Sequence, residues 1–175
     1  MDFCVVRSVG FKALYVFVIL EHGRRKIRHL ALTESPSAAW IIQQLREAMQ
    51  NGDSPRYLHR DNDRIYGNEV PGFLKRLIED VPNSFQSPWQ NPYVERFFGS
   101  LRRELLDHVI VWNAGHLKKL LAEYVDWYEN HRLHKGLAGS APNERDGKAD
   151  TVGEGKIVSI PVLGGLHHRY VRKAA

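Results

Sequence analysis

The sequence predicts an α/β fold in which a mixed, five-stranded β-sheet carries helices on both faces. Two observations support this prediction. The first third of the chain contains three short runs rich in Val, Ile, Phe and Tyr, separated by glycine-containing turns. Amphipathic helical patterns then follow, with a further short strand between the first two. With 175 residues, the chain is long enough to bury a substantial core without disulfides.

Residues 2–8, 13–20 and 25–32 are expected to form the first three strands. Each of the two connecting segments contains a glycine that can adopt positive φ, which favours two hairpins. The second strand, ALYVFVIL, is apolar on both faces and is therefore expected in the middle of a covered sheet. A fourth, shorter strand is expected at RYLHRD, residues 56–61.

Helices are expected through most of the remaining chain. Ser35-Pro36 provides a capping residue and a first helical residue for a helix that ends near Asn51-Gly52. Asn91-Pro92 gives the same signal for a helix that reaches about Leu106. A loop is expected over residues 81–90. The other expected helices are residues 70–80, with Phe73, Leu74, Leu77 and Ile78 facing inward, and a helix that starts at Asn113.

The last part of the chain differs in composition. Residues 132–156 are polar and rich in glycine, and no periodicity is clear. Residues 156–173 predict two short strands around Gly164-Gly165. We therefore expect a core domain over residues 1–140 and a C-terminal extension over residues 141–175 that contains a short strand hairpin.

The charge pattern favours a polyanionic partner. The formal net charge is +5, and the sequence pI is about 9.4. Basic residues form local clusters at residues 24–28, 96–103 and 169–173, whereas acidic residues are scattered. Cys4 is the only cysteine, which excludes an intrachain disulfide and favours a reducing cytoplasm. The longest apolar run, residues 14–20, is too short to cross a membrane as a helix, so no membrane partner is expected.

Three carboxylates from separate segments suggest a metal site. Asp2 begins the first expected strand, Asp61 ends the fourth, and Glu95 lies in the first turn of a long helix. Phosphoryl transfer with two metal ions needs acidic oxygens around cations about 4 Å apart, and these ligands must converge from different elements. Asp63 is an equally acidic alternative to Asp61 on residue type alone.

Candidate nucleic-acid contacts surround Glu95. Arg102 lies seven residues after Glu95 on the same helical face, so one face could carry a metal ligand and a phosphate contact. The aromatic residues before and within the first turn could stack on a displaced base. The expected DNA-binding residues are Trp89, Tyr93, Arg96, Arg102 and Arg103.

Four stretches carry a family resemblance: HRDNDRIYG, SPWQNPYVERFFGSLRREL, YVDWYENHRLHKGL and GGLHHRYVR. Together with the opening forty residues, they resemble the integrase catalytic core of bacterial insertion-sequence transposases, which is related to retroviral integrases. The resemblance implies a ribonuclease H-like fold and a D-D-E triad of Asp2, Asp61 and Glu95. Asp61, rather than Asp63, matches the family motif.

The resemblance also implies a chemistry. Two Mg²⁺ or Mn²⁺ ions bound by the triad would support DNA 3′-end processing, followed by strand transfer to a target phosphodiester. The implied partners are double-stranded DNA, both element ends and target, and further copies of the chain in a homo-oligomer. The implied location is the bacterial cytoplasm, in association with the nucleoid.

The sequence departs from the family pattern at its start. Only Met1 precedes Asp2, whereas the family has strand residues and a helix-turn-helix region before the first aspartate. The 33 residues between Asp61 and Glu95 are also slightly fewer than in the family. The two departures at the start of the chain predict a truncated gene or a late start codon. The alternative to an active transposase is therefore an inactive remnant that only binds DNA or full-length transposase.

Overall fold

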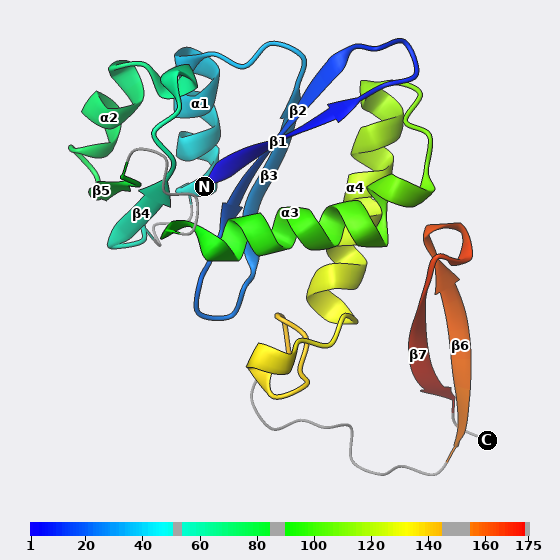
Figure 1. The fold of residues 1–175 in the computed structure, drawn as a ribbon. Coiled ribbons are helices and arrows are strands. Elements are labelled where there is room, and N and C mark those ends of the chain that lie inside the picture. The colour runs from blue at the N-terminus through cyan, green and yellow to red at the C-terminus, as the bar shows by residue number, and fades with distance from the viewer. Residues whose placement is uncertain (51–53, 85–89, 145–154, 174–175) are drawn as a thin grey trace. The chain divides into compact units, whose positions relative to one another are not determined.

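The structure is a computed structural model that describes residues 1–50, 54–84, 90–144 and 155–173 (Figure 1). Its contacts gather into two compact units: residues 1–21 with 27–114, and residues 22–26 with 115–175. The division of the chain at residue 140 stays a prediction. No helix among the described residues combines the length and the apolar character needed to cross a membrane.

The first unit begins with the predicted antiparallel strands. They are β1 (Asp2–Arg7), β2 (Ala13–Leu20) and β3 (Ile27–Thr33), and they form one sheet in the order β1-β2-β3. Asp2 pairs with Val18, and Arg7 pairs with Ala13. Every residue from Val16 to Leu20 is buried, which confirms that β2 is the covered central strand.

Helices cover both faces of this sheet. Because side chains alternate along a strand, Phe17 and Ile19 lie on one face and Val16 and Val18 on the other. Phe17 and Ile19 join a core cluster with residues of α1 (Ala38–Ala48) and α2 (Glu69–Leu74). The opposite face is covered by α3 (Pro92–Glu104), which crosses the strands in Figure 1.

The start of α1 differs from the prediction by two residues. Ser37, not Ser35, is the N-cap, and its side-chain oxygen accepts a hydrogen bond from the Trp40 N–H at 3.2 Å. The reason is geometric, since a capping oxygen reaches the backbone N–H two or three residues ahead. The inward face of the helix includes Ile41 and Leu45, which are fully buried.

The predicted helix over residues 70–80 is wrong in its second half. The helix α2 ends at Leu74, Leu77 is 52% exposed, and the strand β5 (Glu79–Pro82) follows. β5 pairs in parallel with β4 (Tyr57–Arg60). The expected loop over residues 81–90 therefore begins as a strand. The strand β5 depends on pairing with β4, 22 residues earlier in the sequence, and no local pattern reveals this partner.

The single five-stranded sheet is not confirmed. Among the described residues of this unit, the strands form one sheet of three and one sheet of two. The edges of the two sheets meet at one point, because the backbone nitrogen of Met1 donates a hydrogen bond to the carbonyl of His59. This contact places the start of β1 beside β4.

A buried ion pair fastens β4 to β5. Arg60 Nε and Nη2 donate to the two carboxylate oxygens of Asp80, each at 2.9 Å, and both side chains are almost fully buried. Arg60 Nη1 also donates to the backbone carbonyl of Asp61 at 3.0 Å. The two-pronged geometry fixes the orientation of the guanidinium group.

The second unit contains most of α4 (Ala114–Asn130) and a terminal hairpin. The buried face of α4 includes Leu117, Leu121 and Tyr124. The strands β6 (Lys156–Val162) and β7 (His167–Lys173) pair in antiparallel fashion, which confirms the predicted hairpin around Gly164-Gly165.

We predict that breaking the Arg60–Asp80 pair destabilises the protein more than replacing it. Arg60→Met leaves the carboxylate of Asp80 buried without its partner, at an expected cost of about 3–5 kcal/mol. The double variant Arg60→Met with Asp80→Leu removes both charges and is expected to be considerably more stable than the single variant. Urea unfolding monitored by circular dichroism measures both.

The exposed Lys12–Glu34 pair, with 3.6 Å between Nζ and Oε2, provides the control. Lys12→Met is expected to change the free energy of unfolding by about 1 kcal/mol or less, because solvent screens this pair. Equal losses for Lys12→Met and Arg60→Met would contradict the role given to the buried pair.

Candidate active site

Three segments that each carry a predicted carboxylate meet at Met1. Its backbone nitrogen donates to the carbonyl of His59, two residues before Asp61. Its carbonyl accepts a hydrogen bond from Asn91 Nδ2 at 3.4 Å, and this buried asparagine is the residue before α3. Two hydrogen bonds that involve the backbone of Met1 therefore hold the start of β1 beside the end of β4 and the start of α3.

The carboxylates that follow these contacts influence one another. Burial first, and then the nearby carboxylates of Asp61 and Glu95, raise the pKa of Asp2 from 3.8 to about 7. A hydrogen bond from the Phe3 N–H to Asp2 Oδ1, at 2.7 Å, acts in the opposite direction; its effect on the pKa is smaller than that of burial but larger than that of either carboxylate. Burial also raises the pKa of Asp61. The electrostatic field at Asp2 therefore favours a neutralising proton or cation.

Asp61 carries a buried oxygen that hydrogen bonds do not fully satisfy. Neither its Oδ1 nor the hydroxyl group of buried Tyr66 makes a well-formed hydrogen bond, although Tyr66 and the Asp63 N–H lie close enough to Asp61 to act against the rise in its pKa. The two groups are near enough that Asp61 contributes to raising the pKa of Tyr66, after the larger effect of burial. Since a buried carboxylate oxygen normally finds a partner, this atom fits a site that accepts a metal ion or a water molecule.

A complete ligand cluster is not formed. No group of three or more His, Cys, Asp or Glu side chains among the described residues is arranged to hold a metal ion. Glu95 lies in the first turn of α3 with its side chain exposed. The carboxylates are thus close enough to interact through their charges but are not gathered into coordination geometry.

Asp61 and Asp63 occupy different environments. Asp63 is exposed, and its Oδ1 accepts the Ile65 N–H at 2.9 Å as the cap of a short 3₁₀ turn, Arg64–Tyr66. Asp61 is half-buried, and its charge interacts with that of Asp2. Of the two alternatives, only Asp61 faces the other predicted carboxylates.

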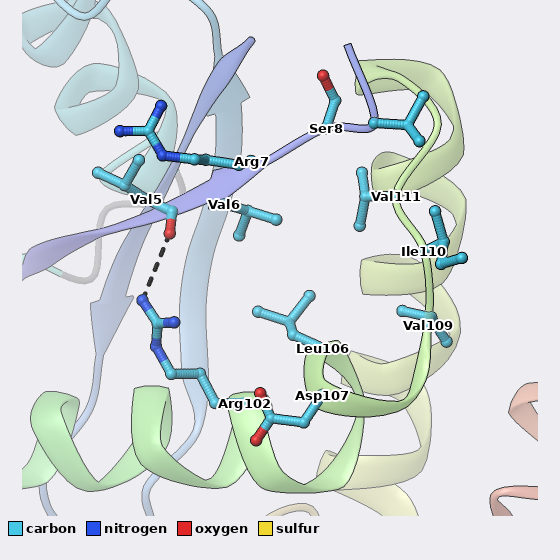
Figure 2. A pocket seen from close by; sticks show the side chains of 11 residues that line it. Val5, Val6, Arg7, Ser8, Arg102, Leu106, Asp107, Val109, Ile110 and Val111 are labelled. Atoms are coloured by element: carbon cyan, nitrogen blue, oxygen red, sulfur yellow. Dashed lines mark hydrogen bonds between the residues drawn. The ribbon is translucent and has the colours of Figure 1, made fainter. Parts of the chain in front are cut away.

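The predicted DNA-contacting residues lie mostly along α3. Arg102 Nη2 donates to the carbonyl of Val5 at 3.4 Å and to Cys4 Sγ at 3.5 Å, so the guanidinium group is held against β1 (Figure 2). An arginine has five N–H donors, so this anchoring permits a further contact with phosphate. Tyr93, Arg96 and Arg103 are exposed on the same helix, whereas Trp89 lies outside the described residues.

A cavity of about 430 Å³ opens beside Arg102 (Figure 2). It lies between the second half of β1 and residues 106–111, and its walls are mainly valine, leucine and isoleucine side chains. Arg7, Arg102 and Asp107 supply its charged lining. Asp2, Asp61 and Glu95 do not line it, so this cavity is separate from the meeting point of the carboxylates.

The residues that position the site do not follow from the sequence pattern. The pattern predicts a helix cap at Asn91, but its side chain makes no capping bond and contacts the Met1 carbonyl instead. Arg60, Asp80 and Tyr66 are not among the residues predicted for the site. A usable signal was present for Arg60 alone, because a charged residue inside a short apolar strand needs a buried partner.

Comparison with known proteins agrees with this architecture. Residues 81–142 match the family described as the integrase core domain. This part of the chain is therefore similar to an integrase core domain. Over 142 residues, which are 81% of the chain, it is 25% identical to the insertion element IS407 uncharacterized 31.7 kDa protein of Burkholderia multivorans. A stretch of 67 residues is 31% identical to methionine–tRNA ligase of Chloroflexus aurantiacus but covers 34% of the chain.

Solved structures share the fold of this chain. The catalytic core domain of BIV integrase matches 81% of the chain and 88% of its own length, with a TM-score of 0.57 and 16% identity. The HTLV-2 integrase catalytic core domain in complex with magnesium gives a TM-score of 0.57 at 13% identity, over 81% of the chain and 90% of that domain. A chain of the simian T-cell lymphotropic virus intasome covers 99% of this chain, with a TM-score of 0.62 and 18% identity. These likenesses establish the ribonuclease H-like fold.

The chain spans less than half of the length of the curated relatives that it matches. The match covers 47% of the IS407 protein and 11% of the methionine–tRNA ligase. It also covers 65% of the intasome chain.

We predict that Asp2 makes the stability of the metal-free protein depend on pH. Its pKa is raised in the folded state, so its contribution to stability is full below about pH 4 and is lost as the pH rises to about 7. Asp2→Asn is therefore expected to be more stable than the parent at pH 8 in EDTA, with the difference vanishing near pH 4. Urea unfolding across this pH range is the measurement.

Asp63→Asn is the matched control, since Asp63 is exposed and an asparagine retains the capping oxygen. Its stability is expected to follow that of the parent at every pH. If Asp2→Asn also follows the parent from pH 4 to pH 8, the electrostatic coupling at this site is not as described.

Proposed function

We propose that this chain catalyses metal-dependent DNA 3′-end processing and strand transfer, as a transposase or integrase. The observation that carries the proposal is the meeting of three segments at Met1, with the carboxylates of Asp61 and Glu95 within electrostatic reach of Asp2. The match of residues 81–142 to the integrase core domain gives independent support.

The residues of the site fit a divalent cation. Asp2 has a raised pKa that a cation would lower, and Asp61 Oδ1 is a buried oxygen without a hydrogen-bond partner. Hard cations such as Mg²⁺ and Mn²⁺ prefer carboxylate oxygens, and the HTLV-2 catalytic core was solved in complex with magnesium. When bound, two such ions would activate the attacking oxygen and stabilise the leaving oxygen of a phosphodiester.

The chain itself contributes orientation. Arg60 holds the Asp61 carbonyl while its guanidinium group is locked by Asp80, so the backbone that carries the Asp61 side chain is fixed. Asn91 fixes the start of α3 relative to Asp2 and thereby limits where the Glu95 side chain can reach. Glu95 is exposed, and its side chain can turn toward the other two carboxylates when a cation neutralises them.

DNA is the substrate that the surrounding charge supports. Arg96, Arg102 and Arg103 lie within two turns of Glu95 on α3, and arginine is well suited to phosphate oxygens. Tyr93 precedes Glu95 by two residues and offers an exposed aromatic ring for a displaced base. We extend the proposal to a homo-oligomer acting on element ends and target DNA in the bacterial cytoplasm, and to one continuous five-stranded sheet through the Met1–His59 contact.

A second candidate function is DNA binding without catalysis. It is favoured by one observation, the lack of a formed metal-ligand cluster among the described residues. Metal-dependent cleavage by the purified chain separates the two candidates.

We predict that Asp61→Asn and Glu95→Gln reduce nicking of supercoiled plasmid in Mn²⁺ or Mg²⁺ to the level seen with EDTA, because an amide is a weaker ligand for a hard cation. Asp63→Asn, two residues away and exposed, is expected to retain the parental rate. Circular dichroism and DNA-binding measurements confirm that each variant folds and binds. A parent that binds plasmid but never nicks it would favour the second candidate, and Glu95→Gln nicking at the parental rate would overturn the site assignment.

A further inference from the structure

The terminal hairpin is a two-stranded ribbon with one fully exposed face. Seven residue pairs join β6 and β7, from Lys156↔Lys173 to Val162↔His167, and no third strand pairs with them among the described residues. Tyr170 is 69% exposed and Ile157 is 60% exposed. Alternation of side chains places six exposed residues on this face: Ile157, Ser159, Pro161, His168, Tyr170 and Arg172.

The end of the ribbon near its turn is fixed to α4. The Trp127 ring stacks on His167 with 3.9 Å between ring centroids and an interplanar angle of 13°, and Trp127 Nε1 donates to the carbonyl of His168 at 3.3 Å. At the turn, the Leu163 N–H donates to the carboxylate of Glu123. An isolated two-stranded hairpin is only marginally stable in water, so these contacts supply the anchoring that keeps the ribbon formed.

The ribbon carries most of the excess charge of the chain. Residues 155–173 contain four Lys or Arg residues and no Asp or Glu, which gives +4 of the formal net charge of +5. Arg172 lies on the exposed face, and its Nη1 also donates to the carbonyl of Gly155 at 3.0 Å. The other three cations, Lys156, Arg169 and Lys173, alternate onto the opposite face of the ribbon. A densely cationic ribbon repels another copy of itself and attracts a polyanion, which disfavours self-association through this face.

We propose that the β6–β7 ribbon inserts its exposed face into the major groove of double-stranded DNA. The major groove of B-form DNA, about 12 Å wide, admits a two-stranded β-ribbon, whereas the major groove of A-form RNA is too narrow for side chains to read. Alternate residues of a strand advance roughly 6.6 Å, close to the rise of two base pairs. His168, Tyr170 and Arg172 thus face successive positions along the groove.

This inference rests on the proposed function only in taking DNA as the partner. It needs no metal ion and does not involve the carboxylate site. The ribbon would add a second area of DNA contact, formed by residues of the second unit, to the one proposed along α3.

Fluorescence anisotropy in EDTA, with the full chain and a labelled duplex of random sequence, tests the proposal. The double variant Arg172→Gln with Lys173→Gln removes the cation of the exposed face and an adjacent exposed lysine, whose long side chain can reach a backbone phosphate at the edge of the groove. It is expected to bind at least about 10-fold more weakly and to reduce the salt slope by about 2, because each lost phosphate contact lowers the slope by roughly 0.9. The matched control is Lys75→Gln with Arg76→Gln, an adjacent exposed pair in the first unit, which is expected to have a smaller effect on both quantities.

A second variant guards against loss of structure in the hairpin. Ser159→Glu places a negative charge on the exposed face and is also expected to weaken binding. Hydrogen exchange over residues 156–173 reports whether the ribbon stays formed in each variant. Competition is expected from methyl green, which occupies the major groove, and not from distamycin, which occupies the minor groove.

Several results would overturn the proposal. They are equal losses for the hairpin pair and the Lys75/Arg76 pair, unchanged binding by Ser159→Glu, preference for duplex RNA, or a parent that does not bind duplex DNA. A parent that binds duplex through the ribbon but does not nick plasmid with metal would support this inference and overturn the proposed chemistry instead.

Discussion

The candidate site depends on two hydrogen bonds made by the backbone of Met1. One reaches the carbonyl of His59 on β4, and the other comes from the buried side chain of Asn91 before α3. Asp2, Asp61 and Glu95 lie within four residues of these contacts, so their approach is a consequence of backbone geometry. The core supports this arrangement, because Met1 packs with Phe17, Ile41 and other buried residues of the first unit. The burial of these apolar side chains offsets the repulsion between the nearby carboxylates.

The cations nearest the site serve different purposes. Arg60 forms an ion pair with Asp80 and donates a hydrogen bond to the Asp61 carbonyl, so it orients the backbone of Asp61. Arg102 is held against β1 by the Val5 carbonyl. Burial, the largest cause, keeps the pKa of Asp2 raised, at about 7, although arginines lie on two neighbouring elements. A carboxylate site left short of positive charge in this way retains its affinity for a divalent cation, which full pairing with arginine would remove.

Local sequence patterns predict the elements whose formation depends on residues close together in the sequence. The apolar run of β2, the Asn91-Pro92 start of α3 and the β6–β7 hairpin all follow from periodicity and turn residues. β5 was missed because its strand is short and its pairing relies on the distant Arg60. For the site, the three carboxylates could be selected from residue type and family resemblance. The contacts that bring them together could not, since Met1 and Asn91 are joined across ninety residues of sequence.

The hairpin illustrates how function can be separated between two units of one chain. The carboxylates need burial, because desolvation gives Asp2 its raised pKa. A phosphate-binding surface needs the opposite, long cationic side chains in solvent, where counterion release contributes to affinity. In the proposed arrangement, exposed Arg172 and Lys173 on a ribbon anchored by Trp127 add positive charge for DNA in the second unit to that of the arginines on α3.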